Sequence, residues 1–207
     1  MTAQAKFEFT PANLAEAKKI IAKYPAGRQA SAVMPLLMIA QRQHDNWLPQ
    51  AAIEYVARML GMAAIRVHEV ASFYTMYNLK PSGRTQVQVC TTTPCWLRGS
   101  DAIVKACERA LGIKCGEVTK DGAIGLKEVE CLGACVNAPM MQIGDDYYED
   151  LNSITTESIL KTLKAGGKPK PGSQIGRHTC EPAGGLTTLI GGQTAAKKPG
   201  KGKEPGQ

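Results

Sequence analysis

The sequence predicts a mixed α/β (α+β) fold, in which a small N-terminal helical bundle precedes a mixed sheet with flanking helices. Three observations support this prediction. Apolar residues recur at helical spacing through residues 11–78. From residue 85 the spacing changes to the alternation of a β-strand. Short strand and helix segments then follow one another to residue 166, an order that gives helices packed against a small sheet.

The N-terminal part is expected to hold four helices with short connections. The first begins near residue 11 and is ended by the Tyr24–Gly27 segment. The next three are expected at residues 30–43, 49–60 and 64–74, and Gly61 follows the third helix as a stop signal. Phe73 and Tyr77 share a face at helical spacing, so we expect both to pack in the core.

The second part is expected to alternate strands and helices. Thr85–Cys90 alternates as a strand, a loop over residues 91–99 follows, and Ser100 is a suitable N-cap for a helix ending at Leu111. Gly144 opens a turn that should pair two short strands as a hairpin. The remaining elements are expected at residues 124–130 (strand), 140–143 (strand), 147–148 (strand) and 155–163 (helix).

Composition divides the chain into three parts: a helical bundle at 1–80, the sheet domain at 81–166 and a Gly/Pro/Lys-rich tail at 167–207. The tail is expected to be extended or disordered unless a partner orders it. Residues 166–207 carry seven Lys or Arg against two Glu, so most of the net charge of +7 belongs to the tail. Without a basic, aromatic-rich folded surface, we expect no nucleic-acid binding.

The chain shows no pattern of a secreted or membrane-spanning protein. Its seven cysteines are odd in number, and its N-terminal residues lack an apolar signal core. The longest apolar stretch, Ala32–Ala40, is too short for a membrane span. We therefore expect a cytoplasmic protein, or a peripheral subunit on a cytoplasmic face, with no direct membrane insertion.

Four cysteines carry the strongest functional signal. Cys90 and Cys95 form a C-x4-C pair, and thirty-five residues later Cys131 and Cys135 form a C-x3-C pair. Both pairs are expected where strands end, so adjacent strands could bring the four thiolates around one centre. Four thiolates are the ligands of a [2Fe-2S] cluster and also of a structural zinc ion, and the spacing leaves both possibilities open.

Other cysteine chemistries fit the pattern less well. A thioredoxin-type disulfide exchanger needs C-x-x-C, which is absent, and a Rieske centre needs two histidines, whereas the three histidines lie far from the pairs in sequence. Gly133, Ala134 and Gly99 are small enough for their N–H groups to approach sulfur. Of the other cysteines, we expect a core position for Cys107 and a free thiol for Cys180. Cys115 could approach the cluster, but no second cysteine lies close to it in sequence to form a pair.

The sequence shows no site for other chemistry. It has no G-x-G-x-x-G or Walker-type loop for a nucleotide or flavin phosphate, and no pattern of acid–base or covalent catalysis. An electron-transfer protein needs neither, because its cofactor carries the chemistry.

Three motifs resemble one family along nearly the whole chain. The cysteine pattern followed by Asn137-Ala-Pro-Met, the Val67–Tyr77 segment and the Gly176–Leu186 segment are similar to the thioredoxin-like [2Fe-2S] subunit of NADH:quinone oxidoreductase, respiratory complex I. The resemblance implies a thioredoxin-like [2Fe-2S] ferredoxin domain, with one cluster held by Cys90, Cys95, Cys131 and Cys135. It also suggests a cis peptide bond at Ala138–Pro139.

The resemblance further implies an electron-transfer subunit that is not catalytic alone. Its partners would be the subunit that binds FMN and NADH, which alone would hold the FMN, and the large iron–sulfur subunit. Its place would be peripheral, on the cytoplasmic side of the inner membrane. Two alternatives remain: an equivalent diaphorase subunit of an NAD-linked hydrogenase or formate dehydrogenase, and a zinc-stabilised binding module.

Overall fold

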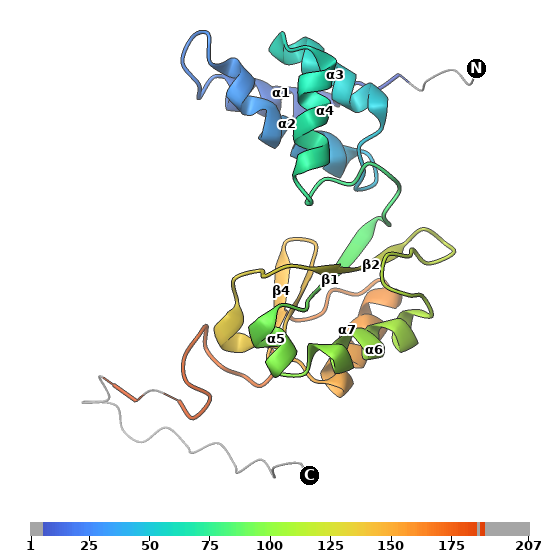
Figure 1. The fold of residues 1–207 in the computed structure, drawn as a ribbon, viewed down its shortest axis with the longest axis vertical. Helices are drawn as coiled ribbons and strands as arrows, with labels where there is room; N and C mark the ends of the chain where they lie inside the picture. Colours follow the sequence, from blue (N-terminus) through green and yellow to red (C-terminus); the bar gives the residue numbers. More distant parts are fainter. Residues whose placement is uncertain (1–5, 186, 189–207) are drawn as a thin grey trace. The chain divides into compact units, whose positions relative to one another are not determined.

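A computed structural model describes residues 6–185 and 187–188. The chain divides into two compact units (Figure 1). The first unit combines residues 1–87 with 111–127, and the second combines residues 88–110 with 128–207. All four cysteines of the two pairs therefore belong to the second unit. Within the part of the chain that the structure describes, no helix is long and apolar enough to cross a membrane.

The first unit contains the four helices that the sequence predicts. They are α1 (Pro11–Ile21), α2 (Val33–Gln43), α3 (Gln50–Leu60) and α4 (Ala64–Phe73), with a short 3-10 helix, η1 (Gln29–Ala32), before α2 (Figure 1). The Thr10 hydroxyl caps α1 by accepting a hydrogen bond from Asn13 N at 3.3 Å. Gly61 ends α3 with a left-handed backbone (φ 63°), as expected of a C-terminal glycine.

The core of this unit corrects one sequence prediction. Tyr77 is buried, and its hydroxyl donates a 2.8 Å hydrogen bond to the carbonyl oxygen of Met34. Phe73, however, is 77% exposed, so its predicted core position is wrong. Helix α4 ends at Phe73, and Tyr77 lies beyond the helix, so helical spacing does not place the two rings on one face.

The sheet has five strands in the order β2-β1-β3-β4-β5. Their bounds are Thr85–Cys90 (β1), Ile124–Val129 (β2), Met141–Ile143 (β3), Asp146–Glu149 (β4) and Gly172–Ser173 (β5). Thr85 N bonds Ala123 O before β2 and Thr91 N bonds Val129 O at its end, so β1 and β2 run in the same direction. Their carboxyl ends therefore meet at one edge of the sheet.

The predicted hairpin is also present. Strands β3 and β4 pair antiparallel, with Met141 opposite Tyr148. Strand β5 pairs parallel to β4, so the sheet contains both parallel and antiparallel pairs. The two-residue strand β5 was not expected from the sequence. It is an extended segment, which the prediction for the chain beyond Gly166 allows, and residues 186 and 189–207 of that tail lie outside the described residues.

Three helices accompany the sheet: α5 (Thr93–Leu97), α6 (Ser100–Leu111) and α7 (Ser153–Lys164). Helix α5 lies where the sequence predicts a loop. Ser100 is the first residue of α6, and its buried hydroxyl has no hydrogen-bond partner among the described residues, so the predicted N-cap is wrong. Asn152, by contrast, caps α7 by accepting a 2.9 Å hydrogen bond from Thr155 N.

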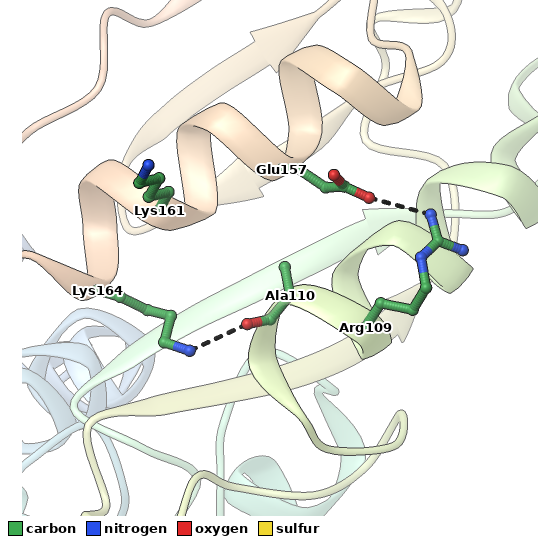
Figure 2. Close-up of a pocket in the computed structure, with 5 residues that line it drawn as sticks. All are labelled: Arg109, Ala110, Glu157, Lys161 and Lys164. Atoms are coloured by element: carbon green, nitrogen blue, oxygen red, sulfur yellow. Dashed lines mark hydrogen bonds and ion pairs between the residues drawn. The ribbon is translucent and has the colours of Figure 1, made fainter.

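Polar contacts join α6 to α7. Arg109 forms a 3.0 Å ion pair with Glu157, and Lys164 Nζ donates to the carbonyl oxygen of Ala110 at 3.0 Å (Figure 2). The second contact satisfies a carbonyl at the C-terminal end of α6, where such groups lack helical partners. These residues, with Lys161, line a surface pocket that contains none of the cysteines.

Backbone crowding explains one glycine in β2. A Cβ atom on Gly125 would lie 2.0 Å from the carbonyl oxygen of Ser82, far inside van der Waals contact. The facing residue Gly83 has φ +86° and would place a Cβ 2.5 Å from Gly125 N. Only glycine allows this close approach of two backbone segments.

Candidate metal centre

The fold brings each predicted ligand to the end of a strand or the turn after it. Cys90 is the last residue of β1, and Cys95 lies in α5, which follows β1. Cys131 comes two residues after β2, and Cys135 begins the short 3-10 helix η2 (Cys135–Asn137). Since β1 and β2 are adjacent and parallel, both cysteine pairs follow strands that end at the same edge of the sheet.

The first pair is enclosed in apolar surroundings. Cys90 and Cys95 are each 1% exposed and pack with Ala138 and Met140. Leu132, Ala134 and Tyr147 pack against this cluster, and the first two belong to the loop that carries the second pair. The Cys131–Cys135 loop therefore covers the thiols of the first pair.

The second pair lies closer to solvent. Cys131 is exposed and Cys135 is half-buried, and their Sγ atoms are 3.3 Å apart without a covalent bond. The backbone N–H of Gly133 donates to Cys131 Sγ at 3.4 Å, which confirms the sequence prediction for this glycine. The Gly99 N–H donates instead to the carbonyl oxygen of Trp96, so the same prediction for Gly99 is wrong.

The surroundings of the two buried thiols shift their pKa values in opposite directions. Burial raises the pKa of Cys95 to about 12, with further contributions from its hydrogen bond to Cys90 and the charge of that neighbour. Burial opposes ionisation of Cys90 as well. However, hydrogen bonds from the Thr92 hydroxyl and from the backbone of Thr92 and Leu132 hold the Cys90 pKa below its ordinary value.

Thiols of both pairs influence the pKa values of Cys135 and Cys95. The hydrogen bond with Cys131 is the main cause that raises the pKa of Cys135, followed by burial and by the charges of Cys131 and Cys90. The charge of Cys135 in turn contributes to the raised pKa of Cys95. Four thiolates this close repel one another, and bound metal cations remove that repulsion by replacing the protons.

The donor set fits a binuclear iron–sulfur centre. Thiolate sulfur is the ligand that iron–sulfur clusters use, and such a cluster takes one pair for each iron. The four thiols stand as two pairs, because Cys131 contacts Cys135 and Cys95 is hydrogen-bonded to Cys90.

The other predictions for this region have clear outcomes. Cys107 is fully buried on α6, as predicted, and Cys180 is exposed. Cys115 is half-buried and belongs to the first unit, whereas the four proposed ligands belong to the second. The Ala138–Pro139 peptide bond is cis, which confirms the sequence prediction.

Three contributors to the site were not predicted from the sequence. Thr92 Oγ1 lies 3.3 Å from Cys90 Sγ, and a hydroxyl two residues after a proposed ligand was the signal that could have found it. The backbone of Leu132 bonds Cys90, and the Tyr147 hydroxyl donates to the Leu132 carbonyl oxygen at 2.7 Å. These last two contacts join distant parts of the chain, so no local pattern indicates them.

Comparison with known proteins identifies the family of this chain. Residues 17–164 match the model of the thioredoxin-like [2Fe-2S] ferredoxin family, and the chain belongs to that family. Membership makes a [2Fe-2S] cluster the cofactor of this chain.

Two relatives of this chain are subunits of enzymes that oxidise NADH. The chain is 60% identical over 158 residues to the E subunit of the NADH-quinone oxidoreductase of Rickettsia bellii, covering 76% of this chain and 95% of that protein. It is 51% identical over 184 residues to the mitochondrial NADH dehydrogenase [ubiquinone] flavoprotein 2 of Dictyostelium discoideum, covering 89% of this chain and 74% of that protein.

A solved structure shares the fold. An NAD+-reducing [NiFe]-hydrogenase chain superposes with a TM-score of 0.55 at 20% identity over 63% of this chain. The match covers 22% of the hydrogenase chain, so the likeness concerns one part of a larger protein.

Proposed function

We propose that this chain is the electron-transfer subunit of an NADH-quinone oxidoreductase, complex I, and that Cys90, Cys95, Cys131 and Cys135 hold its [2Fe-2S] cluster. The observation that carries the proposal is the meeting of two thiol pairs at the carboxyl edge of β1 and β2. The identity to the Rickettsia bellii relative supports the host complex. The chain is then part of an oxidoreductase and is not catalytic alone.

The bound cluster would supply one-electron chemistry, and the residues of this chain would set its surroundings. The buried pair, Cys90 and Cys95, excludes water from one side of the centre. Backbone N–H groups of Gly133 and Leu132 donate toward the sulfurs of Cys131 and Cys90, respectively. Such donors stabilise negative charge on the ligands and therefore favour the reduced state.

The specific partners follow from the same proposal. The electrons would be exchanged with the FMN of a subunit that binds FMN and NADH, and the large iron–sulfur subunit would be a neighbour. Trp96, Leu97 and Val136 support a docking surface beside the centre, because each closely follows a proposed ligand and is between 58% and 70% exposed. The location would be peripheral, on the cytoplasmic side of the inner membrane, without membrane insertion.

The domain division is proposed on the same basis. Residues 1–80 would form the helical bundle, residues 81–166 the ferredoxin domain that carries the cluster, and residues 167–207 a basic tail. Expression of residues 81–188 alone, followed by cluster analysis, tests whether the proposed ferredoxin domain and its adjoining segment are sufficient for assembly.

A second host has one specific observation in its favour, the fold shared with an NAD+-reducing hydrogenase. In that case the chain would be the diaphorase subunit of an NAD-linked hydrogenase or formate dehydrogenase. The two hosts differ in the proteins that copurify with a tagged chain from native membranes or cytosol. Quinone-reducing subunits would identify complex I.

The test of the cofactor is anaerobic purification followed by iron and sulfide analysis and by EPR after dithionite reduction. We expect about two irons and two sulfides per chain and a rhombic signal. Serine at any of the four proposed ligands should weaken or abolish the signal, whereas C107S and C180S should keep it. A colourless protein that contains zinc but no sulfide would instead establish a zinc-stabilised binding module.

A further inference from the structure

The C-terminal segment Gly172–Glu181, here called the strap, is part of the second unit. It begins with β5, in which Ser173 pairs with Glu149 of β4, and Gln174 N donates to the Glu149 carbonyl oxygen at 3.0 Å. The family match ends at Lys164, so the strap lies beyond the region that the family model covers. Its contacts nevertheless include Val136 and Asn137, the two residues that follow the proposed ligand Cys135.

A buried ion pair anchors the strap. The Arg177 guanidinium pairs through Nη2 with the carboxylate of Asp150, and the two side chains are only 10% and 5% exposed. The Ser173 hydroxyl donates to the other carboxylate oxygen at 2.7 Å and accepts a 3.2 Å bond from Arg177 N. Because both charges are buried, removing one of them leaves the other without compensation.

The anchored strap reaches the turn that follows Cys135. Arg177 Nη1 donates to the carbonyl oxygen of Val136 at 3.4 Å and to that of Glu181 at 3.1 Å. Val136 is the residue directly after Cys135. The same guanidinium therefore bonds the strap to itself, to Asp150 and to the backbone of the proposed ligand turn.

Asn137 makes a second connection between the strap and this turn. Its side chain is buried, and Nδ2 donates to the Thr179 carbonyl oxygen at 2.7 Å and to Glu149 Oε2 at 2.7 Å. The Asn137 carbonyl oxygen accepts a 2.8 Å bond from Asp150 N. Asp150 thus bonds the turn through its backbone and Arg177 through its carboxylate.

We propose that Arg177 is a positioning residue for the [2Fe-2S] cluster, which it serves by fixing the Cys135–Asn137 turn through Asp150 and Val136. The inference rests on the proposed ligation by Cys135. When the strap fixes the Cys135–Asn137 turn, Cys135 loses less conformational freedom as the cluster binds. By thermodynamic linkage, the bound cluster then stabilises the contacts of the strap by the same free energy.

The first test measures cluster retention in the full-length chain. R177M removes the guanidinium and keeps most of the side-chain volume. R177K keeps the positive charge, but a lysine cannot bond Asp150 and the Val136 carbonyl oxygen through two separate nitrogen atoms. R109M is the matched control, because Arg109 forms an exposed ion pair with Glu157 on α6 and α7 (Figure 2). After anaerobic purification, iron release to a chelator, the reduction potential and the EPR line shape are measured for each variant.

We expect R177M to release iron about 10- to 100-fold faster than the unmodified chain and to shift the potential and EPR line shape, as loss of an outer contact does at metal sites. R177K should recover only part of the retention, and R109M should match the unmodified chain. A folded R177M with unchanged retention, potential and line shape overturns the role of Arg177. Absence of an iron–sulfur cluster from the unmodified chain contradicts the proposed function instead.

A second test uses the unmodified chain and so decides the matter even if R177M does not fold. Hydrogen exchange of the strap amides, including Ile175 and Arg177, is compared with and without the cluster. Reciprocal linkage predicts that cluster loading slows exchange in the strap and in the 133–137 turn together. Unchanged strap exchange on loading overturns the proposal.

Discussion

The Tyr147 hydroxyl donates a 2.7 Å hydrogen bond to the carbonyl oxygen of Leu132. Tyr147 belongs to the β3–β4 hairpin, and Leu132 lies between the two cysteines of the exposed pair. The Leu132 backbone also bonds the Cys90 sulfur. The backbone of Leu132 therefore bonds both the β3–β4 hairpin, through Tyr147, and the proposed ligand Cys90.

Removal of this hydroxyl should loosen the loop without changing the shape of the core. We expect Y147F to lower the free energy of unfolding by about 1 kcal/mol, the usual net contribution of one hydrogen bond. Urea denaturation of the purified chain gives this value. Y74F, at an exposed tyrosine of the first unit, should change stability by less than about 0.5 kcal/mol. Equal effects of the two substitutions would contradict the role of the Tyr147 hydroxyl.

Gly125 offers a test of the backbone packing beside β2. An alanine Cβ would overlap the Ser82 carbonyl oxygen, so the two segments must separate. We expect G125A to cost about 3 kcal/mol or more, at the upper end of overpacking effects. G184A serves as the control, because a Cβ there meets no atom within 4 Å. Urea midpoints for both variants check the prediction, and similar midpoints would show that the segments can move apart freely.

Alkaline pH should destabilise the first unit through Tyr77. Burial, with a smaller contribution from Tyr74, raises the pKa of Tyr77 from 10.0 to about 12. Above pH 10 the unfolded chain loses this proton while the folded chain keeps it, so stability falls as pH rises from about 10 to 12. The two pKa values imply a loss of about 2–3 kcal/mol by pH 12.

The Y77F variant isolates this effect. At neutral pH it should be less stable by about 1 kcal/mol, because the Met34 carbonyl loses its donor. Between pH 10 and 12, however, its stability should decline less steeply than that of the unmodified chain. Denaturation curves followed by circular dichroism at several pH values measure the difference. Parallel declines would assign the alkaline loss to other groups.

Trp96 tests the docking surface proposed beside the centre. Its side chain is 58% exposed directly after Cys95, and large aromatic residues often dominate binding at interfaces. We expect W96A to weaken association with the FMN-binding subunit about 30-fold, which corresponds to roughly 2 kcal/mol. I154A is the control, because Ile154 is also exposed but lies in α7. Titration calorimetry with the isolated partner measures both affinities.

The regular elements of this fold were predictable because each has a local signal. Helical spacing and Gly61 marked α1 to α4, and alternation marked β1 up to the first proposed ligand, Cys90. Helix α5 has only five residues and β5 only two, too few to show a period. Phe73 was misplaced because helical spacing was extended past the end of α4.

The proposed site also contains features with a local sequence signal and features without one. The proposed ligands could be chosen from the spacing of the four cysteines, because strand ends are local features. Tyr147, Leu132 and Arg177 act through bonds between segments that are distant in sequence, and such bonds depend on sheet order and on the path of the strap. A single sequence carries no signal for these contacts, and only the folded chain shows them.

The unequal burial of the two cysteine pairs leaves the centre more accessible to solvent from one side, the side of Cys131. Cys90 and Cys95 are closed off by the protein, while Cys131 faces outward. Oxygen, chelators and thiol reagents would therefore attack the isolated chain from the Cys131 side first. A partner that covers this side during assembly would protect the centre at the same moment as it begins to exchange electrons with it.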